Sequence, residues 1–257
     1  MLKLLNTQVQ IIRALAIRDI QSQQTGLAYG LGWVFFDTFL AFAGLLIMKV
    51  AIRGYGGIPG IPVVTYLVSG LVPWLMFSSM YHLPDGAIKR SKNLLHLPVV
   101  TELDLVLAAA VRGFLIYSIV FVVLATLAAF YDGIGFPRFP LGIMLMFLSM
   151  FIMGIGLGFI LMILSRLYAP AGKFVGFFMR FSMILSGVIF QVAMFPSSAL
   201  PYLAWNPLLH VEELLRTYWF YSYHTPIGSP AYVAECVLIM TFFGLLLERY
   251  ARRRLPP

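Results

Sequence analysis

Two adjacent glutamates stand in a segment of the chain that is rich in aromatic residues. The segment, residues 206–223, reads NPLLHVEELLRTYWFYSY and carries Glu212, Glu213 and Arg216. It lies between two of the most apolar stretches of the sequence. Charged side chains are costly in apolar surroundings unless they are paired or hydrogen-bonded, so these residues call for a functional explanation.

Motifs that perform chemistry on a substrate are missing from the sequence. Gly172-Lys173 is a Gly-Lys pair, but no glycine stands five residues before Gly172, so the phosphate-binding pattern GxxxxGK[ST] fails. HExxH, CxxC and a glycine-framed serine are also absent, and the histidines lack metal-ligand spacing. We therefore expect no enzymatic activity, no catalytic residue, no metal site and no cofactor bound by this chain.

The composition indicates a membrane protein. Of the 257 residues, 61% are hydrophobic and 11% are charged, against about 45–50% and about 25% in soluble domains. Only helices and closed barrels satisfy the backbone inside a bilayer, and runs such as LGIMLMFLSMFIMGIGLGFILMIL do not alternate as barrel strands do. The sequence therefore predicts an all-α membrane protein. Cys236, the single cysteine, cannot form an intramolecular disulfide.

Six stretches are long and apolar enough to span a membrane, which takes about 20 residues. They lie near 28–50, 62–82, 103–130, 140–164, 174–196 and 231–248. Twelve of the 18 Lys and Arg residues fall at the two termini and in the loops after spans two and four, which predicts that both termini are cytoplasmic. This distribution accounts for most of the net charge of +8, so we expect no nucleic-acid partner.

Two spans carry ionisable side chains at helical spacing. The first has a stripe of Tyr29, Trp33, Asp37, Leu40 and Gly44, and the fifth is expected to place Arg180, Gly187 and Gln191 on one face. One hypothesis is a polar conduit with Asp37 and Arg180 near its inner end. The alternative is that these two residues form a structural ion pair inside the helix bundle.

Two cytoplasmic segments show helical periodicity without being spans. The N-terminal segment, residues 1–26, places apolar residues on one face, which predicts an amphipathic helix at the membrane surface. It is a membrane anchor or, in addition, a contact for a partner. The loop after span two is bracketed by Pro84 and Pro98, and we expect a short helix there whose leucines face a partner; the alternative is a solvated connector.

Residues 197–230 are predicted to lie on the external side of the membrane, because span five starts from the cytoplasm and span six returns to it. Pro201 and Pro207 divide this segment into short helices and Pro226 closes it. Its apolar residues lie at helical spacing with Glu212, Glu213 and Arg216 between them, which is compatible with a pair of interfacial helices.

The layout and three local stretches together resemble the ABC-2 type permeases. RDIQSQQTGLAYGLGWVFFDTF is similar to the entry into span one of polysaccharide-export permeases, KRSKNLLHLPVVTELDL to their cytoplasmic coupling loop, and WNPLLHVEELLR to their Asn-Pro, Glu, Arg segment. The resemblance covers nearly the whole chain, although each motif alone is only moderately specific. It is greatest to the capsular polysaccharide exporters of Gram-negative bacteria, the KpsM-like transmembrane subunits.

That resemblance implies one ABC-2 transmembrane domain over residues 1–257, with the type V exporter architecture. Within it, 1–26 is an interface helix, 84–100 the coupling helix region and 197–230 the periplasmic re-entrant helices. The family works as a homodimer in the inner membrane with a separate cytoplasmic ATPase (2:2), which binds the ATP and Mg. The substrate implied is a lipid-linked, acidic capsular polysaccharide, and a periplasmic adaptor or co-polymerase and an outer-membrane channel are further partners.

The resemblance and the residue patterns together assign three groups of candidate site residues. The substrate conduit contains Tyr29, Trp33, Asp37, Arg180 and Gln191. The ATPase-coupling group contains Lys89, Arg90, Lys92, Leu94, Leu95 and Leu97. The periplasmic gate contains Trp205, Glu212, Arg216, Tyr218, Trp219 and Tyr221. Aromatic residues with a polar handle suit sugar rings, but they are also ordinary packing and belt residues of membrane proteins.

Other functions remain open from the sequence. An ABC-2 permease for O-antigen, teichoic acid or a small hydrophobic drug has a similar layout. An ion-coupled secondary transporter would require internal repeats, and residues 28–130 and 140–248 show no convincing repeat. An intramembrane scaffold without transport is a third class.

Overall fold

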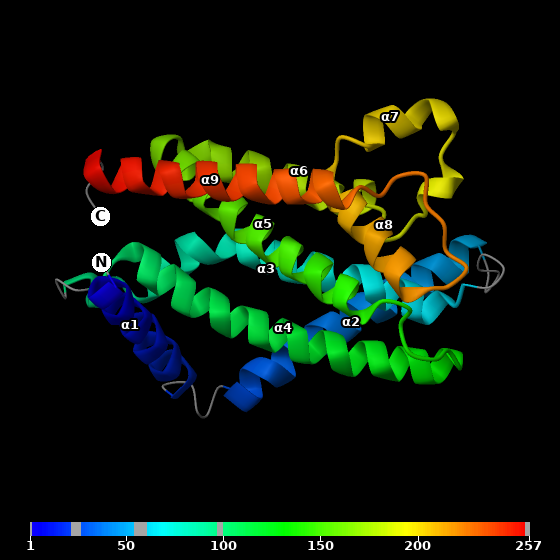
Figure 1. Ribbon diagram of the computed structural model, residues 1–257, viewed down its shortest axis with the longest axis horizontal. Coiled ribbons are helices and arrows are strands. Elements are labelled where there is room, and N and C mark those ends of the chain that lie inside the picture. Colours follow the sequence, from blue (N-terminus) through cyan, green and yellow to red (C-terminus); the bar gives the residue numbers. More distant parts are fainter. Residues whose placement is uncertain (1, 22–26, 54–60, 97–99, 255–257) are drawn as a thin grey trace.

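The computed structural model describes residues 2–21, 27–53, 61–96 and 100–254, and all regular elements within these ranges are helices (Figure 1). The longer ones are α1 (Leu2–Gln21), α2 (Leu27–Arg53), α3 (Val63–Arg90), α4 (Glu102–Asp132), α5 (Pro140–Leu167), α6 (Ala169–Leu185), α8 (Pro207–Trp219) and α9 (Pro230–Arg254). The short ones are η1 (Lys92–His96), η2 (Val192–Met194), η3 (Ser197–Ala199) and α7 (Leu200–Leu203). The all-α prediction is confirmed.

Five of these helices are long and apolar enough to cross a membrane: α2, α3, α4, α5 and α9. They coincide with five of the six predicted spans. The remaining span was predicted near 174–196, but α6 is a helix of 17 residues that ends at Leu185. Five candidate spans are thus established for the described part of the chain.

The prediction that Arg180, Gly187 and Gln191 share one helix face is wrong, because α6 ends at Leu185. Gly187 has a φ of 78°, a left-handed conformation that glycine adopts without a Cβ penalty, and its N–H donates to the Ile184 carbonyl oxygen at 3.3 Å. The chain therefore leaves the helix, so Gly187 and Gln191 do not continue the face of Arg180. Beyond it, Val188 packs with Leu71 and Trp74 of α3.

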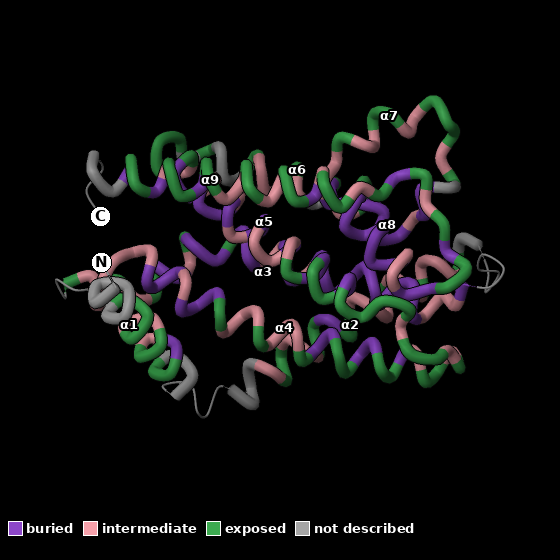
Figure 2. The backbone as a smooth tube through the Cα atoms, viewed as in Figure 1, coloured by how far each residue is buried: buried purple, intermediate pink, exposed green. Residues whose placement is uncertain are grey.

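The helix α3 lies at the centre of the bundle. It packs against α4 and α5 and also contacts α2 and α8, and it is buried along most of its length (Figure 2). The prediction that Pro84 begins a separate helix is wrong, because α3 continues through Pro73 and Pro84 to Arg90. Packing on two neighbouring helices outweighs the hydrogen bonds that the prolines remove.

Three glycines let α5 approach a helix on each side. A Cβ on Gly154 or Gly158 would lie 3.0 or 2.8 Å from a backbone oxygen of α3. On the other side, a Cβ on Gly244 of α9 would lie 2.5 Å from the carbonyl oxygen of Gly156. Small residues at helix crossings allow close backbone contact in membrane bundles. The sequence MGIGLGF therefore joins α3, α5 and α9.

The N-terminal helix α1 packs against the beginning of α4. The Gln8 side-chain amide donates to both carboxylate oxygens of Asp104, at 3.0 and 3.2 Å. The same carboxylate accepts from the backbone N–H and the hydroxyl of Thr101, at 3.0 and 2.7 Å, in a capping box that starts α4. One buried carboxylate thus holds α1, α4 and the end of the preceding loop together.

The two ends of the bundle differ. α1 begins and α9 ends at one end of the molecule, whereas α7 and α8 lie at the opposite end (Figure 1). The coupling residues directly precede the first turn of α4, where α1 packs, and the gate residues lie on and around α8. The two groups therefore lie at opposite ends of the bundle.

Candidate functional site

The predicted stripe on α2 lies on a face that the rest of the chain leaves uncovered. Trp33, Asp37, Leu40 and Gly44 are all exposed, while the opposite side of α2 packs on the core. The side chains of two other conduit residues, Tyr29 and Arg180, lie outside the described residues, so the pairing of Asp37 with Arg180 stays a prediction. Gln191 is buried in the segment that follows α6.

The coupling residues lie on the last turn of α3 and on η1. Lys89, Arg90 and Lys92 are exposed, and Lys89 pairs with Asp85 one turn earlier at 2.7 Å. The leucines are less accessible than their spacing predicts. Leu94 is half-buried and Leu95 packs against the protein's own core, because η1 folds back on the bundle. Leu97 lies outside the described residues.

The gate residues divide into an exposed and a buried set. Trp205 and Tyr221 are largely exposed. Tyr218 is half-buried and its ring lies edge-on to Phe139 at 5.5 Å, and Trp219 is buried with its ring 6.2 Å from that of Phe121. Their packing makes Tyr218 and Trp219 structural contacts within this chain. Glu212 and Arg216 are fully buried.

Asn206 fixes where α8 begins. Its side-chain oxygen accepts from the Leu208 N–H at 3.0 Å, and Pro207 occupies the first helical position, where a missing N–H costs nothing. The Asn206 amide also donates to the Leu185 carbonyl oxygen and to the Ser186 hydroxyl, at 3.3 and 3.2 Å. The Asn-Pro pair therefore connects the start of α8 to the end of α6.

Replacing Asn206 by alanine is expected to lower the free energy of unfolding by about 1–2 kcal/mol. The variant loses the cap of α8 and both hydrogen bonds to the end of α6. Chemical denaturation of the purified protein in detergent measures the difference. Asn93, an exposed residue of η1, provides the control, and Asn93→Ala is expected to change stability by less than about 0.5 kcal/mol.

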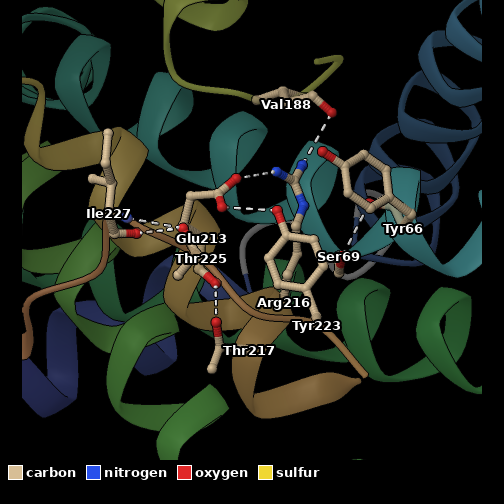
Figure 3. Close-up of polar contacts among 9 residues, drawn as sticks. All are labelled: Tyr66, Ser69, Val188, Glu213, Arg216, Thr217, Tyr223, Thr225 and Ile227. Carbon is tan, nitrogen blue, oxygen red and sulfur yellow. Dashed lines mark hydrogen bonds and ion pairs between the residues drawn. The ribbon is translucent and has the colours of Figure 1, made fainter. Parts of the chain in front are cut away.

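The charged residues of α8 form a buried cluster with two tyrosines, and Figure 3 shows Glu213, Arg216, Tyr66 and Tyr223 of this cluster. We call Tyr66, Glu212, Glu213, Arg216 and Tyr223 the Glu–Arg cluster. Arg216 pairs with Glu213 at 3.3 Å and donates to the Val188 carbonyl oxygen at 3.2 Å. The Tyr223 hydroxyl donates to the other Glu213 oxygen at 2.7 Å, and burial raises the pKa of Tyr223, so the phenol keeps its proton. Both Glu213 oxygens thus accept hydrogen bonds.

The helix α3 forms the other wall of the cluster. The Arg216 guanidinium lies 3.9 Å from the centre of the Tyr66 ring, and the Lys49 ammonium of α2 lies 4.2 Å from the centre of that ring. Both are cation–π contacts. One turn along α3, Gly70 leaves room for the charged groups, because a Cβ there would lie 2.7 Å from Arg216 Nη2 and 2.9 Å from Glu212 Oε2. The cluster therefore connects α8 to α3 and to the segment after α6.

Sequence reasoning found Glu212 and Arg216 but did not include Tyr66, Gly70, Glu213 and Tyr223 among the site residues. The available signal was the spacing of two acids and an arginine on one short amphipathic helix. That spacing gave no indication of the partners on α3, because a tyrosine and a glycine are common in apolar spans.

Known proteins similar to this chain come from capsule export systems. The polysialic acid transport protein KpsM of Escherichia coli is 28% identical over 93% of this chain and 92% of its own length. The capsule polysaccharide export inner-membrane protein CtrC of Neisseria meningitidis serogroup B is 25% identical over 93% of this chain and 90% of its own. BexB of Haemophilus influenzae, another capsule polysaccharide export inner-membrane protein, is 22% identical over 97% and 94%.

The chain is a homologue of KpsM, CtrC and BexB. No protein-family model matches it. The similarity to each of the three export proteins covers at least 93% of the chain, so it includes η1 and α8 as well as the central apolar helices. Two of the three relatives are named inner-membrane proteins, and the described residues of this homologue include five helices that are long and apolar enough to cross a membrane. The protein is therefore placed in the inner membrane.

Proposed function

We propose that this protein is the transmembrane permease of an ATP-driven exporter of capsular polysaccharide. The observation that carries the proposal is the full-length similarity to capsule export proteins, together with membrane-spanning helices. The ATP is bound and hydrolysed, with Mg, by a separate cytoplasmic subunit in a 2:2 complex, and the substrate is a lipid-linked, acidic polysaccharide. A periplasmic adaptor and an outer-membrane channel continue the path.

The proposed topology has six spans and both termini in the cytoplasm. α6 and the segment that follows it form the fifth crossing, although α6 alone has only 17 residues. α7 and α8 are then re-entrant elements on the periplasmic side, at the end of the molecule opposite to the start of α1 (Figure 1). The exposure of Trp205 and Tyr221 at that end supports a contact with sugar or with the adaptor.

A second copy of the chain is proposed to cover the open face of α2. Trp33 and Leu40 are each 60% exposed there, and α6 carries exposed Phe177 and Phe181. In a homodimer these faces would border the conduit, with Asp37 as the charged group that α2 adds to it. The aromatic rings would meet the apolar faces of sugar residues as the polymer passes.

Coupling to the ATPase is proposed to take place at the end of α3 and at η1. The exposed basic residues there are matched by an acidic surface on the ATPase, and charge reversal places like charges across that contact. We expect Arg90→Glu with Lys92→Glu to weaken association at least about tenfold. The measurement is copurification of the tagged permease with a candidate ATPase subunit, followed by an assay of ATP hydrolysis.

Arg138→Glu is the matched control, since Arg138 is exposed in the loop between α4 and α5, far from η1. It is expected to leave association unchanged. A wild-type pair that does not associate, or associates without hydrolysing ATP, would contradict the exporter function. Unchanged association in the double variant alone would contradict only the coupling site.

A further inference from the structure

The Glu–Arg cluster contains one more acid than base. Glu212, Glu213 and Arg216 are each at most 1% exposed. Glu213 accepts from Arg216 and from Tyr223, which is the pattern of an ionised carboxylate. Arg216 and Glu213 therefore neutralise each other. If Glu212 were also ionised, two buried carboxylates would share the single guanidinium of Arg216.

Both carboxyl oxygens of Glu212 are buried and have no hydrogen-bond partner among the described residues. Oε2 lies against Gly70 of α3, beside Arg216 Nη2. An isolated buried carboxylate is among the most costly groups in a protein, and in practice it is neutralised instead. A buried water would supply a hydrogen bond but would leave the charge in place.

We propose that the Glu212 carboxyl binds a proton and that α8 packs on α3 with that proton in place. A metal cation is a poorer occupant, because it would lie beside the Arg216 guanidinium. The described residues also contain no group of three metal ligands. The proton site goes beyond the transport function proposed above and does not depend on it.

The surroundings of Glu212 agree with a neutral carboxyl. Burial holds the pKa of Glu212 well above its ordinary value; Arg216 lowers that pKa and Glu213 raises it further. The other titratable groups at this contact are Tyr66 of α3, with Lys49 of α2 on its ring, and Tyr223. Where α9 meets α8, the rings of His210 and Tyr232 lie 4.7 Å apart.

The proton links the position of α8 to pH. When Glu212 leaves the cluster for water, its pKa returns to about 4.3, so at neutral pH the proton is released. The raised pKa of the folded state means that this contribution to stability is full below about pH 4.3 and is lost as the pH rises through the folded value. Between the two values, the folding equilibrium constant falls about tenfold per pH unit.

Infrared spectroscopy of the purified full-length protein in an ester-free detergent tests the proposal directly. A protonated carboxyl has a C=O stretching band that a carboxylate lacks. We expect this band in the wild type at neutral pH, its loss in Glu212→Gln, and its retention in Glu213→Gln and in Glu235→Gln, which changes an exposed acid of α9. Absence of the band in the wild type, or its loss in Glu213→Gln alone, would overturn the assignment.

Thermal unfolding as a function of pH gives a second readout. The unfolding temperature of the wild type and of Glu235→Gln is expected to fall as the pH rises from about 5 to about 9. This interval covers the raised pKa values that buried glutamates reach. In Glu212→Gln that part of the fall disappears, because an amide imitates the neutral acid. A wild type without the fall, or a Glu212→Gln protein that does not fold, would count against a neutral Glu212.

Discussion

Replacement of Arg216 by leucine is expected to lower the free energy of unfolding by about 3–5 kcal/mol. The variant leaves Glu213 buried without a counter-charge and removes the hydrogen bond to Val188 together with the contact on the Tyr66 ring. Removal of one partner of a buried ion pair is far more costly than removal of both. Denaturant unfolding of the detergent-solubilised protein measures the loss.

Two further variants separate the charge effect from the packing effect. Glu213→Leu combined with Arg216→Leu is expected to recover much of the lost stability, since no uncompensated charge remains from the pair. Arg138→Leu, at an exposed arginine, is expected to change stability by less than about 0.5 kcal/mol. If Arg216→Leu unfolded at the wild-type denaturant concentration, the buried ion pair would not stabilise the packing of α8 on α3.

Replacement of Gly244 by alanine is expected to destabilise the protein by about 1–3 kcal/mol. The added Cβ would lie 2.5 Å from the Gly156 carbonyl oxygen of α5, and backbone atoms cannot give way as a flexible side chain can. The direction of the change in stability is informative, because a Gly→Ala substitution at an open helix position is neutral or stabilising by up to about 1 kcal/mol. Unfolding temperature in detergent is the measurement.

Gly32 of α2 is the matched control for Gly244. A Cβ on Gly32 would have no atom of the described residues within 4 Å, so Gly32→Ala is expected to leave the unfolding temperature unchanged or higher. Equal behaviour of the two variants would show that α5 and α9 do not approach each other as closely as Gly156 and Gly244 indicate.

Hydropathy and periodicity were sufficient to find the long helices, because membrane spans require runs of apolar residues that little else produces. Hydropathy and periodicity were misleading where tertiary packing determines the point at which a helix ends. The apolar run continues past Leu185, yet the chain turns at Gly187 because Val188 packs on α3 and Asn206 binds the helix end. Pro84 indicated a boundary on local grounds, but α3 is held on two sides by other helices.

The site was predictable in part for a related reason. Glu212 and Arg216 were conspicuous because charge is rare in so apolar a chain. Their spacing did not reveal burial, since an amphipathic helix at a membrane surface has the same pattern. Tyr66 and Gly70 act only through contacts made in three dimensions, and one sequence contains no signal for a contact between helices so far apart in the chain.

The Asp104 carboxylate has a consequence for how the protein is made. Gln8 and Asp104 are separated by 96 residues, and synthesis at about 5–20 residues per second leaves α1 without this partner for roughly 5–20 s. During that interval α1 emerges first, and its apolar face has the membrane surface to bind. Docking of α1 therefore becomes possible only after α2, α3 and the first turn of α4 have left the ribosome.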